Sequence, residues 1–160
     1  MHIKGESKNM AQSLSKVLLH LVFSVKNREA LILNSEMDAL HSYIVATCRE
    51  ISGSAAYRVG GTENHIHIAC ELPRAMTIAN LVRKIKVSSS SWFKARHGVP
   101  KSFAWQTGYG AFSLGQSQLP ALIRYIEAQS ERHRAYSFQE EMLDFLERYK
   151  IEYDEQYLWD

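Results

Sequence analysis

The sequence has 160 residues, of which 46% are hydrophobic and 22% are charged, and its formal net charge is +2 at pH 7. This composition is typical of one soluble domain, because the chain is too short for two domains of ordinary size. Two cysteines make no disulfide framework, and no apolar run approaches the roughly 20 residues of a membrane helix. We therefore expect a cytoplasmic protein that makes no contact with the membrane. A polar leader is expected over residues 1–12, and a single domain over residues 13–160.

The charged residues are unevenly distributed along the chain. Residues 72–126 contain eight basic residues and no acidic one, whereas residues 127–160 contain four basic and ten acidic residues. A basic block of this length indicates a positive surface suited to a phosphate backbone. The alternative is a solvated basic helix whose charge is balanced by the acidic C-terminal segment.

The first 72 residues contain the patterns of one helix between strands. We predict a strand over residues 16–26, a helix over residues 35–51, and strands over residues 54–59 and 65–72. The strands are indicated by apolar side chains at alternate positions, and the helix by an apolar stripe that follows a plausible N-cap, Ser35. Gly60 and Gly61 separate the last two strands, and such a pair predicts a hairpin turn.

The rest of the sequence predicts a second helix, a fourth strand and two further helices. Thr77 is the expected N-cap of the second helix, and residues 103–114 are strand-like but interrupted by glycines. Ser117 is the expected N-cap of the third helix, with Pro120 in its first turn, and a capping box over residues 137–140 begins the last helix. This order predicts an α+β fold: a ferredoxin-like (RRM-like) antiparallel sheet with helices on one face and a C-terminal helical extension.

Two histidines lie close together in the third predicted strand. His65 and His67 are two residues apart, so they project from one open face of the sheet, whereas Ile66 and Ile68 project toward the helices. Two imidazoles in this arrangement can bind one metal ion. The pattern is short, however, and fits two solvated histidines on a polar face equally well.

Three other polar residues, Glu63, Asn64 and His20, each have two interpretations. Glu63 and Asn64 precede the histidine pair and could orient the imidazoles or form a plain turn. His20, in the first predicted strand, could lie on the histidine face or have a purely structural role.

The third predicted helix has a tyrosine and a glutamine four residues apart. Tyr125 and Gln129 therefore lie on one exposed side of this helix, because apolar residues occupy most of the rest. A helical tyrosine usually lies at the edge of a core, and this chain has eight tyrosines. The spacing alone therefore does not select Tyr125 as a nucleophile.

Together, these motifs and their order resemble the HUH single-tyrosine transposases of the insertion-sequence 200/605 type. The similar segments are LLHLVFS (18–24), NHIH (64–67), the basic helix 81–92, WQTGYGAFS (105–113), YIEAQ (125–129) and IEYDEQYLWD (151–160). The resemblance covers residues 13–160 in order. The departures are Lys150 in place of a helix-ending glycine, and Arg132 with His133 in place of a histidine pair.

The resemblance implies a nucleophile and a metal site. Tyr125 is expected to attack a phosphate of single-stranded DNA, which leaves a 5′-phosphotyrosine and a free 3′-hydroxyl. His65, His67 and Gln129 are expected to hold a divalent ion, Mg²⁺ or Mn²⁺. The ion would polarise the phosphate, because a phenol with a pKa near ~10 is a poor nucleophile by itself.

The resemblance also implies partners. We expect a homodimer that acts on single-stranded DNA with hairpin ends and is nucleoid-associated when bound to DNA. The expected contacts to the DNA backbone are Arg83, Lys84, Lys86, Lys94 and Arg96. The alternative function is that of a domesticated relative that binds DNA hairpins without strand transfer. A replication initiator or relaxase is a further alternative, but the small size of the chain argues against it.

Overall fold

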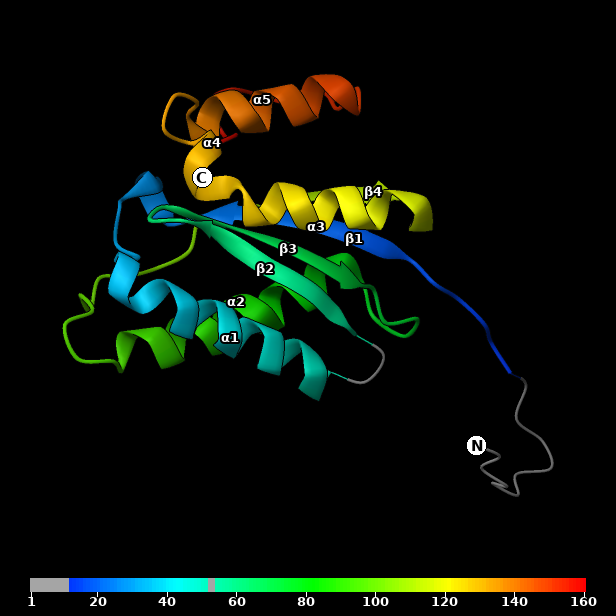
Figure 1. The fold of residues 1–160 in the computed structure, drawn as a ribbon, viewed down its shortest axis with the longest axis horizontal. Helices are drawn as coiled ribbons and strands as arrows, with labels where there is room; N and C mark the ends of the chain where they lie inside the picture. Colours follow the sequence, from blue (N-terminus) through cyan, green and yellow to red (C-terminus); the bar gives the residue numbers. More distant parts are fainter. Residues whose placement is uncertain (1–11, 52–53) are drawn as a thin grey trace.

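The structure, a computed structural model that describes residues 12–51 and 54–160, contains one four-stranded antiparallel sheet with helices on both faces (Figure 1). The strands are β1 (Leu18–Ser24), β2 (Ala56–Thr62), β3 (His65–Glu71) and β4 (Gly110–Leu114). The helices are α1 (Asn34–Glu50), α2 (Ile78–Lys94), α3 (Leu119–Glu127), α4 (Gln129–Arg132) and α5 (Phe138–Arg148), and two 3-10 turns are η1 (Lys26–Arg28) and η2 (Gln116–Gln118). The strand order β2-β3-β1-β4 is that of a ferredoxin-like sheet, which confirms the predicted α+β class.

One face of the sheet forms the main core with α1 and α2. Leu21 of β1 and Ile66 and Ile68 of β3 belong to the same buried cluster as Leu81 and Ile85 of α2. All five side chains are fully buried, and each contributes roughly 1.5–3 kcal/mol relative to an exposed side chain. The alternation along the strands therefore places the neighbouring polar residues of β1 and β3 on the opposite face.

The predicted C-terminal extension covers this opposite face. In Figure 1, α3, α4 and α5 lie on the side of the sheet that faces away from α1 and α2. Val22 of β1 and Phe112 of β4 pack with Phe138, Met142 and Phe145 of α5 in a second buried cluster. Among the described residues, no helix has the length and apolar character that are needed to cross a membrane.

The β2–β3 hairpin turns at Glu63 and Asn64, so the prediction of a turn at Gly60 and Gly61 is wrong. Both glycines lie within β2, and Gly60 serves a long-range contact. A Cβ atom at Gly60 would lie 2.6 Å from Cγ2 and 2.9 Å from the carbonyl oxygen of Ile126 in α3. Because Gly60 has no side chain, α3 can approach the sheet closely.

Residues 103–109 do not form a strand, contrary to the prediction. Strand β4 begins at Gly110, and before it Trp105 makes only an isolated bridge with Val25. The Lys86 ammonium donates hydrogen bonds to the carbonyls of residues 106, 107 and 108 at 2.7, 3.2 and 2.6 Å. The Lys86 ammonium thus supplies the hydrogen bonds that a neighbouring strand would otherwise donate to these carbonyls, and residues 106–108 form no β-ladder.

Helix α3, which contains Tyr125, differs from the prediction at both ends. Ser117 is not its N-cap, because this residue lies in η2 and α3 begins at Leu119 without a side-chain cap. Pro120 lies in the first turn as predicted. The helix ends at Glu127, and Gln129 begins the separate short helix α4.

Two of the other three predicted helix starts are confirmed. The hydroxyls of Thr77 and Ser137 accept hydrogen bonds from the backbone N–H groups of Asn80 and Glu140, each at 3.1 Å. Ser35 instead lies in the first turn of α1, so it is not the N-cap.

The two ends of the chain differ in what the structure describes. The proposed leader over residues 1–12 falls outside the described residues except for Gln12. At the other end, Gly108 N donates a hydrogen bond to the carbonyl oxygen of Asp160 at 2.8 Å, and Trp159 packs near Phe138. The C-terminal residues therefore belong to the folded domain.

Candidate active site

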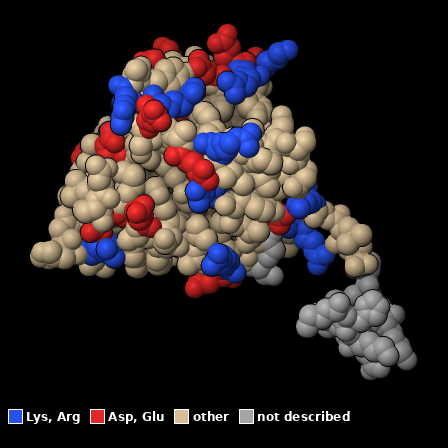
Figure 2. All heavy atoms as spheres, in the orientation of Figure 1, with Lys and Arg blue, Asp and Glu red and all other residues tan. Residues whose placement is uncertain are grey.

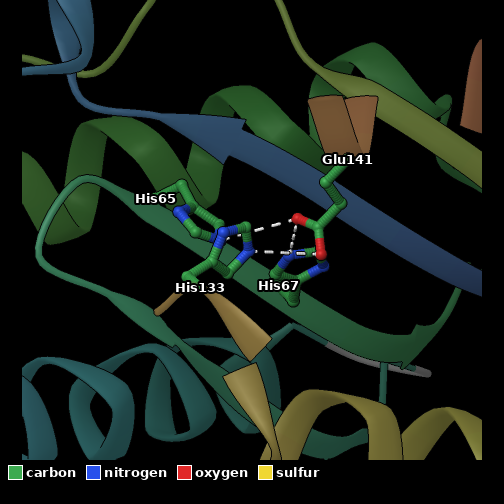
Figure 3. Close-up of side chains that lie close together, drawn as sticks. All are labelled: His65, His67, His133 and Glu141. Carbon is green, nitrogen blue, oxygen red and sulfur yellow. Dashed lines mark hydrogen bonds and ion pairs between the residues drawn. The ribbon is translucent and has the colours of Figure 1, made fainter. Parts of the chain in front are cut away.

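His65 and His67 lie in a buried polar cluster between β3 and the C-terminal helices (Figure 3). Both side chains are 0% exposed, so the expectation that they lie on an open face is wrong. Figure 3 shows His133 and Glu141 pointing toward them from the opposite side. The potential ligand atoms of these four residues lie within 4.8 Å of one another, so the group could hold a metal ion.

The Glu141 carboxylate connects the members of this cluster. Its Oε1 is hydrogen-bonded to His67 Nε2 at 2.8 Å and lies 3.6 Å from His65 Nε2. Its Oε2 accepts hydrogen bonds from Gln129 Nε2 at 3.1 Å and from the Tyr125 hydroxyl. One carboxylate therefore contacts, or lies close to, every residue that the sequence predicted for catalysis and metal binding.

The outer nitrogens of both imidazoles are bound to fixed partners. His65 Nδ1 lies 2.7 Å from Asn64 Oδ1 and 3.0 Å from Thr62 Oγ1. His67 Nδ1 lies 2.7 Å from Nε2 of His20, which is itself 5% exposed. In this structure His67 Nε2 donates to Glu141, because an ionised carboxylate only accepts. If a metal ion takes the place of that proton, a proton on each Nδ1 leaves both Nε2 lone pairs facing the ion, which is the tautomer that a metal-bound histidine uses. Asn64 and His20 are therefore placed to orient the pair.

The protonation states also suit a metal site. Burial lowers the pKa of His65 to about 3, and burial also lowers the pKa of His20 well below its usual value. Burial alone would raise the pKa of the Glu141 carboxyl, but hydrogen bonds from His133 and His67 outweigh burial and hold that pKa well below its usual range. At neutral pH the site therefore offers a neutral His65 imidazole and an ionised Glu141 carboxylate, which are the forms that bind metal.

Tyr125 is a weak nucleophile in this arrangement. Burial, and then the neighbouring Glu141 carboxylate, raise the pKa of the Tyr125 hydroxyl above its usual value. The Arg132 guanidinium carbon lies 5.0 Å from the centroid of the tyrosine ring and acts in the opposite direction. Reaction at Tyr125 therefore requires additional positive charge near its oxygen.

The five basic residues predicted to contact DNA do not lie near this cluster. They belong to α2 or directly follow it, and α2 packs on the opposite face of the sheet from α3 (Figure 1). Arg83 and Lys84 are exposed, and Lys94 is half-buried. On the face seen in Figure 2, basic and acidic side chains are interspersed. The basic block of the sequence therefore does not form one broad positive surface on that face.

Two of these five residues are bound within the fold. The Lys86 ammonium donates to three backbone carbonyls, and burial lowers the pKa of Lys86 to about 8. Arg96 forms an ion pair with Glu36, and its guanidinium carbon lies 4.7 Å from the centroid of a Trp92 ring. Both side chains therefore have structural partners that a DNA phosphate would have to replace.

The sequence analysis missed Glu141, although the pattern contains a signal for it. Helix α5 buries Phe138, Met142 and Phe145 at helical spacing, and Glu141 lies on the same stripe. A carboxylate inside an apolar stripe is costly to bury unless it is paired. That position therefore indicates a buried polar partner, which the structure identifies as the histidine cluster.

Two solved structures are similar to this chain in fold. One is a protein from Deinococcus radiodurans R1 that is described as a transposase, with a TM-score of 0.55 and 18% identity over 77% of this chain and 98% of that chain. The other is described as a REP-associated tyrosine transposase bound to a REP hairpin, with a TM-score of 0.55 and 15% identity over 80% of this chain and 74% of that chain. At these identities the similarity establishes the fold alone. No curated protein matches the sequence.

The family comparison is more specific. The sequence model described as "Transposase IS200 like" matches residues 13–129. The matched range includes the histidine pair, Tyr125 and Gln129, and it ends before α5 and Glu141. The match covers well over half of the chain, and the resemblance noted in the sequence is thereby confirmed: this chain belongs to the IS200-like transposase family.

Proposed function

We propose that this protein is a metal-dependent DNA transposase that cleaves and rejoins single-stranded DNA through a covalent bond to Tyr125. The main observation is that Glu141 joins the Tyr125 hydroxyl to the His65 and His67 pair inside one buried cluster. Membership of the IS200-like transposase family supports the class of reaction. The contacts of Glu141 with Tyr125 and His67, and its closeness to His65, support the choice of these residues.

A divalent ion fits the donor atoms at the centre of this cluster. We propose His65 Nε2, His67 Nε2 and the Gln129 amide oxygen as ligands, with Glu141 Oε1 as an additional oxygen donor. Gln129 Oε1 lies 2.9 Å from His65 Nε2, and Glu141 Oε1 lies 2.8 Å from His67 Nε2. Nitrogen and oxygen donors in this combination suit Mn²⁺ or Mg²⁺ and would also accept Zn²⁺. His133 Nε2, 3.3 Å from Glu141 Oε2, is a further candidate ligand.

When bound, the ion supplies positive charge that polarises the scissile phosphate. The oxygen of Tyr125 forms a bond to phosphorus while the bond from phosphorus to the 3′ oxygen of the neighbouring nucleotide breaks. The phenol releases its proton, the 3′ oxygen gains one, and the products are a 5′-phosphotyrosine and a 3′-hydroxyl. Arg132 adds positive charge beside the tyrosine ring. Attack by another 3′-hydroxyl reverses these bond changes, so rejoining requires no ATP.

The proposed partner is single-stranded DNA with hairpin ends. The similar structure that is described as bound to a REP hairpin supports this proposal by analogy. Arg83 and Lys84 remain proposed phosphate contacts, for DNA that reaches the α2 side of the domain. We also propose a homodimer, as the resemblance implies. The Tyr125 hydroxyl and the histidine pair meet within a single chain, which supports cleavage in cis.

A labelled DNA strand from the ends of the element tests the proposed function. With Mn²⁺, the wild-type protein is expected to form a covalent band on a denaturing gel, and EDTA is expected to remove it. The Tyr125→Phe variant is expected to form no band, whereas Tyr153→Phe, a change at a tyrosine 47% exposed outside the cluster, keeps it. Hairpin binding without an adduct under any metal would instead indicate the binding-only relative.

A further inference from the structure

A small cavity adjoins Tyr125. Its volume is about 240 Å³, and the residues that matter for its chemistry are His20, Leu122, Tyr125, Phe145, Arg148 and Tyr149. Sites for drug-sized ligands have volumes of roughly 300–1,000 Å³, so this cavity suits a smaller group. A larger cavity of about 750 Å³ is lined by residues of α1 and α2, and Tyr125 is not among them.

Four of the nine residues that line the small cavity are aromatic: His20, Tyr125, Phe145 and Tyr149. The rings of His20 and Phe145 are 5.1 Å apart between centroids and nearly perpendicular, at 79°. The rings of Tyr125 and Phe145 are 6.0 Å apart at 81°. Tyr149 is 41% exposed at the edge of the cavity. Walls of this kind favour a flat aromatic group that stacks on one ring and meets the edge of another.

One wall also carries a hydrogen-bond donor. Arg148 is exposed, and its guanidinium carbon lies 5.6 Å from the centroid of the Phe145 ring. Among residues 12–51 and 54–160, no acidic side chain forms an ion pair with Arg148. An arginine fork above an aromatic surface can donate to the acceptors on the edge of a nucleobase, and guanine offers two of them.

We propose that this cavity binds the base of the nucleotide next to the scissile phosphate. The inference rests on the proposed function, because it takes Tyr125 as the nucleophile. The oxygen of Tyr125 must reach phosphorus, so the neighbouring base lies within one nucleotide of the tyrosine ring, which is itself a wall of the cavity. The base stacks against the aromatic wall, and Arg148 favours guanine at that position.

The test measures the binding of short oligonucleotides in EDTA, where cleavage is not required. The probes are fluorescently labelled dT10, d(TG)5 and a decamer of abasic sites, and the readout is fluorescence anisotropy. Wild type is expected to bind dT10 roughly 5- to 150-fold more tightly than the abasic decamer, which is the range for stacking of one base on an aromatic side chain. It is also expected to bind d(TG)5 more tightly than dT10.

Two pairs of variants locate the effect. Leu122→Trp fills the cavity and is expected to remove most of the preference for bases, whereas Leu33→Trp, at a residue 57% exposed on the other side of the domain, retains it. Arg148→Ala is expected to remove the preference for d(TG)5, and Arg124→Ala, an equal loss of charge from the exposed side of α3, retains it. Arg148 is exposed, so its variant tests the assignment even if Leu122→Trp does not fold.

Two results would overturn the assignment. One is equal affinity of the wild type for the base-bearing and abasic decamers. The other is a preference for bases that survives both Leu122→Trp and Arg148→Ala. Neither result depends on strand cleavage, so failure to form a Tyr125 adduct would count against the proposed function and leave the cavity test unaffected.

Discussion

The hydroxyl of Tyr125 donates a hydrogen bond to the carboxylate of Glu141, which joins α3 to α5 across the histidine face of the sheet. The same carboxylate is bonded to His67 Nε2 at 2.8 Å and is 1% exposed. The proposed nucleophile and metal ligands are thus connected through a buried charge from a helix that lies beyond the family match. The reaction proposed for this chain therefore depends on α5 as well as on the matched residues.

Removal of the Glu141 charge is expected to weaken metal binding. In titrations with Co²⁺ followed by visible absorption, or with Mn²⁺ by calorimetry, Glu141→Gln and His67→Ala should each lower the affinity by at least about tenfold. The control is His97→Ala, because His97 is exposed and lies outside the cluster. Wild-type affinity in Glu141→Gln would exclude this carboxylate from the ligand set.

The metal-free protein is expected to lose stability as the pH falls from 7 to 5. Burial lowers the pKa of His65 to about 3 in the folded state, whereas a histidine in an unfolded chain titrates near ~6.5. Below this pH the unfolded chain binds a proton that the folded chain does not. The free energy of unfolding therefore falls by up to about 1.4 kcal/mol per pH unit for this residue.

Urea denaturation at pH 7, 6 and 5 checks this expectation. His65→Gln should make the dependence on pH shallower, and His97→Gln, a change at an exposed histidine, should leave it unchanged. Equal slopes for the wild type and His65→Gln would show that His65 titrates normally in the folded protein.

A side chain at position 60 is expected to push α3 away from the sheet. The added Cβ atom of Gly60→Ala would lie 2.6 Å from Ile126 Cγ2, so the expected loss of stability is about 1–3 kcal/mol, together with slower adduct formation at Tyr125. Gly115→Ala is the matched control, because the nearest atom to its added Cβ, Gln118 Oε1, lies 3.7 Å away. Chemical denaturation and the rate of adduct formation are the measurements. An unchanged stability of Gly60→Ala would contradict the close packing of α3 on β2.

Lys86 and Arg83 are expected to differ in role, although both belong to the basic block. Lys86→Met keeps the aliphatic stem but removes the bonds to three carbonyls, so it should cost about 1–3 kcal/mol of stability and leave the salt dependence of DNA binding unchanged. Arg83→Ala should change stability by less than about 0.5 kcal/mol and reduce the salt slope by about 0.7. Chemical denaturation measures the stability of each variant, and DNA-binding titrations at several salt concentrations measure the salt slope. A reduced salt slope with unchanged stability in Lys86→Met would instead show that Lys86 contacts the DNA.

The parts of the site that depend on local periodicity could be predicted from the sequence. Alternation in β3 fixes that His65 and His67 share a face. Tyr125 and Gln129 are only four residues apart, so they stay close and both bind Glu141, although α3 ends between them at Glu127. These relationships involve residues at most four positions apart, so they hold wherever the segment lies in the fold. The sheet order also follows from the sequence of elements, because few topologies accommodate it.

The parts that depend on tertiary contacts could not be predicted in this way. Gly60 resembles a turn residue in sequence, but its role is set by Ile126, far along the chain. Glu141 and His67 meet across a separation of 74 residues, and only the packing of α5 on the sheet brings them together. Lys86 resembles its exposed basic neighbours, and only the path of residues 106–108 shows what its ammonium binds.

The most direct test of the central claim is to locate the residue that becomes linked to DNA. Trypsin cuts after Arg124 and Arg132, so the peptide of residues 125–132 contains Tyr125 as its only tyrosine. After a reaction with Mn²⁺ and single-stranded DNA from the element's ends, followed by nuclease digestion, tandem mass spectrometry is expected to find a nucleotide remnant on this peptide. A remnant on any other peptide, with residues 125–132 unmodified, would contradict the assignment of Tyr125 as the nucleophile.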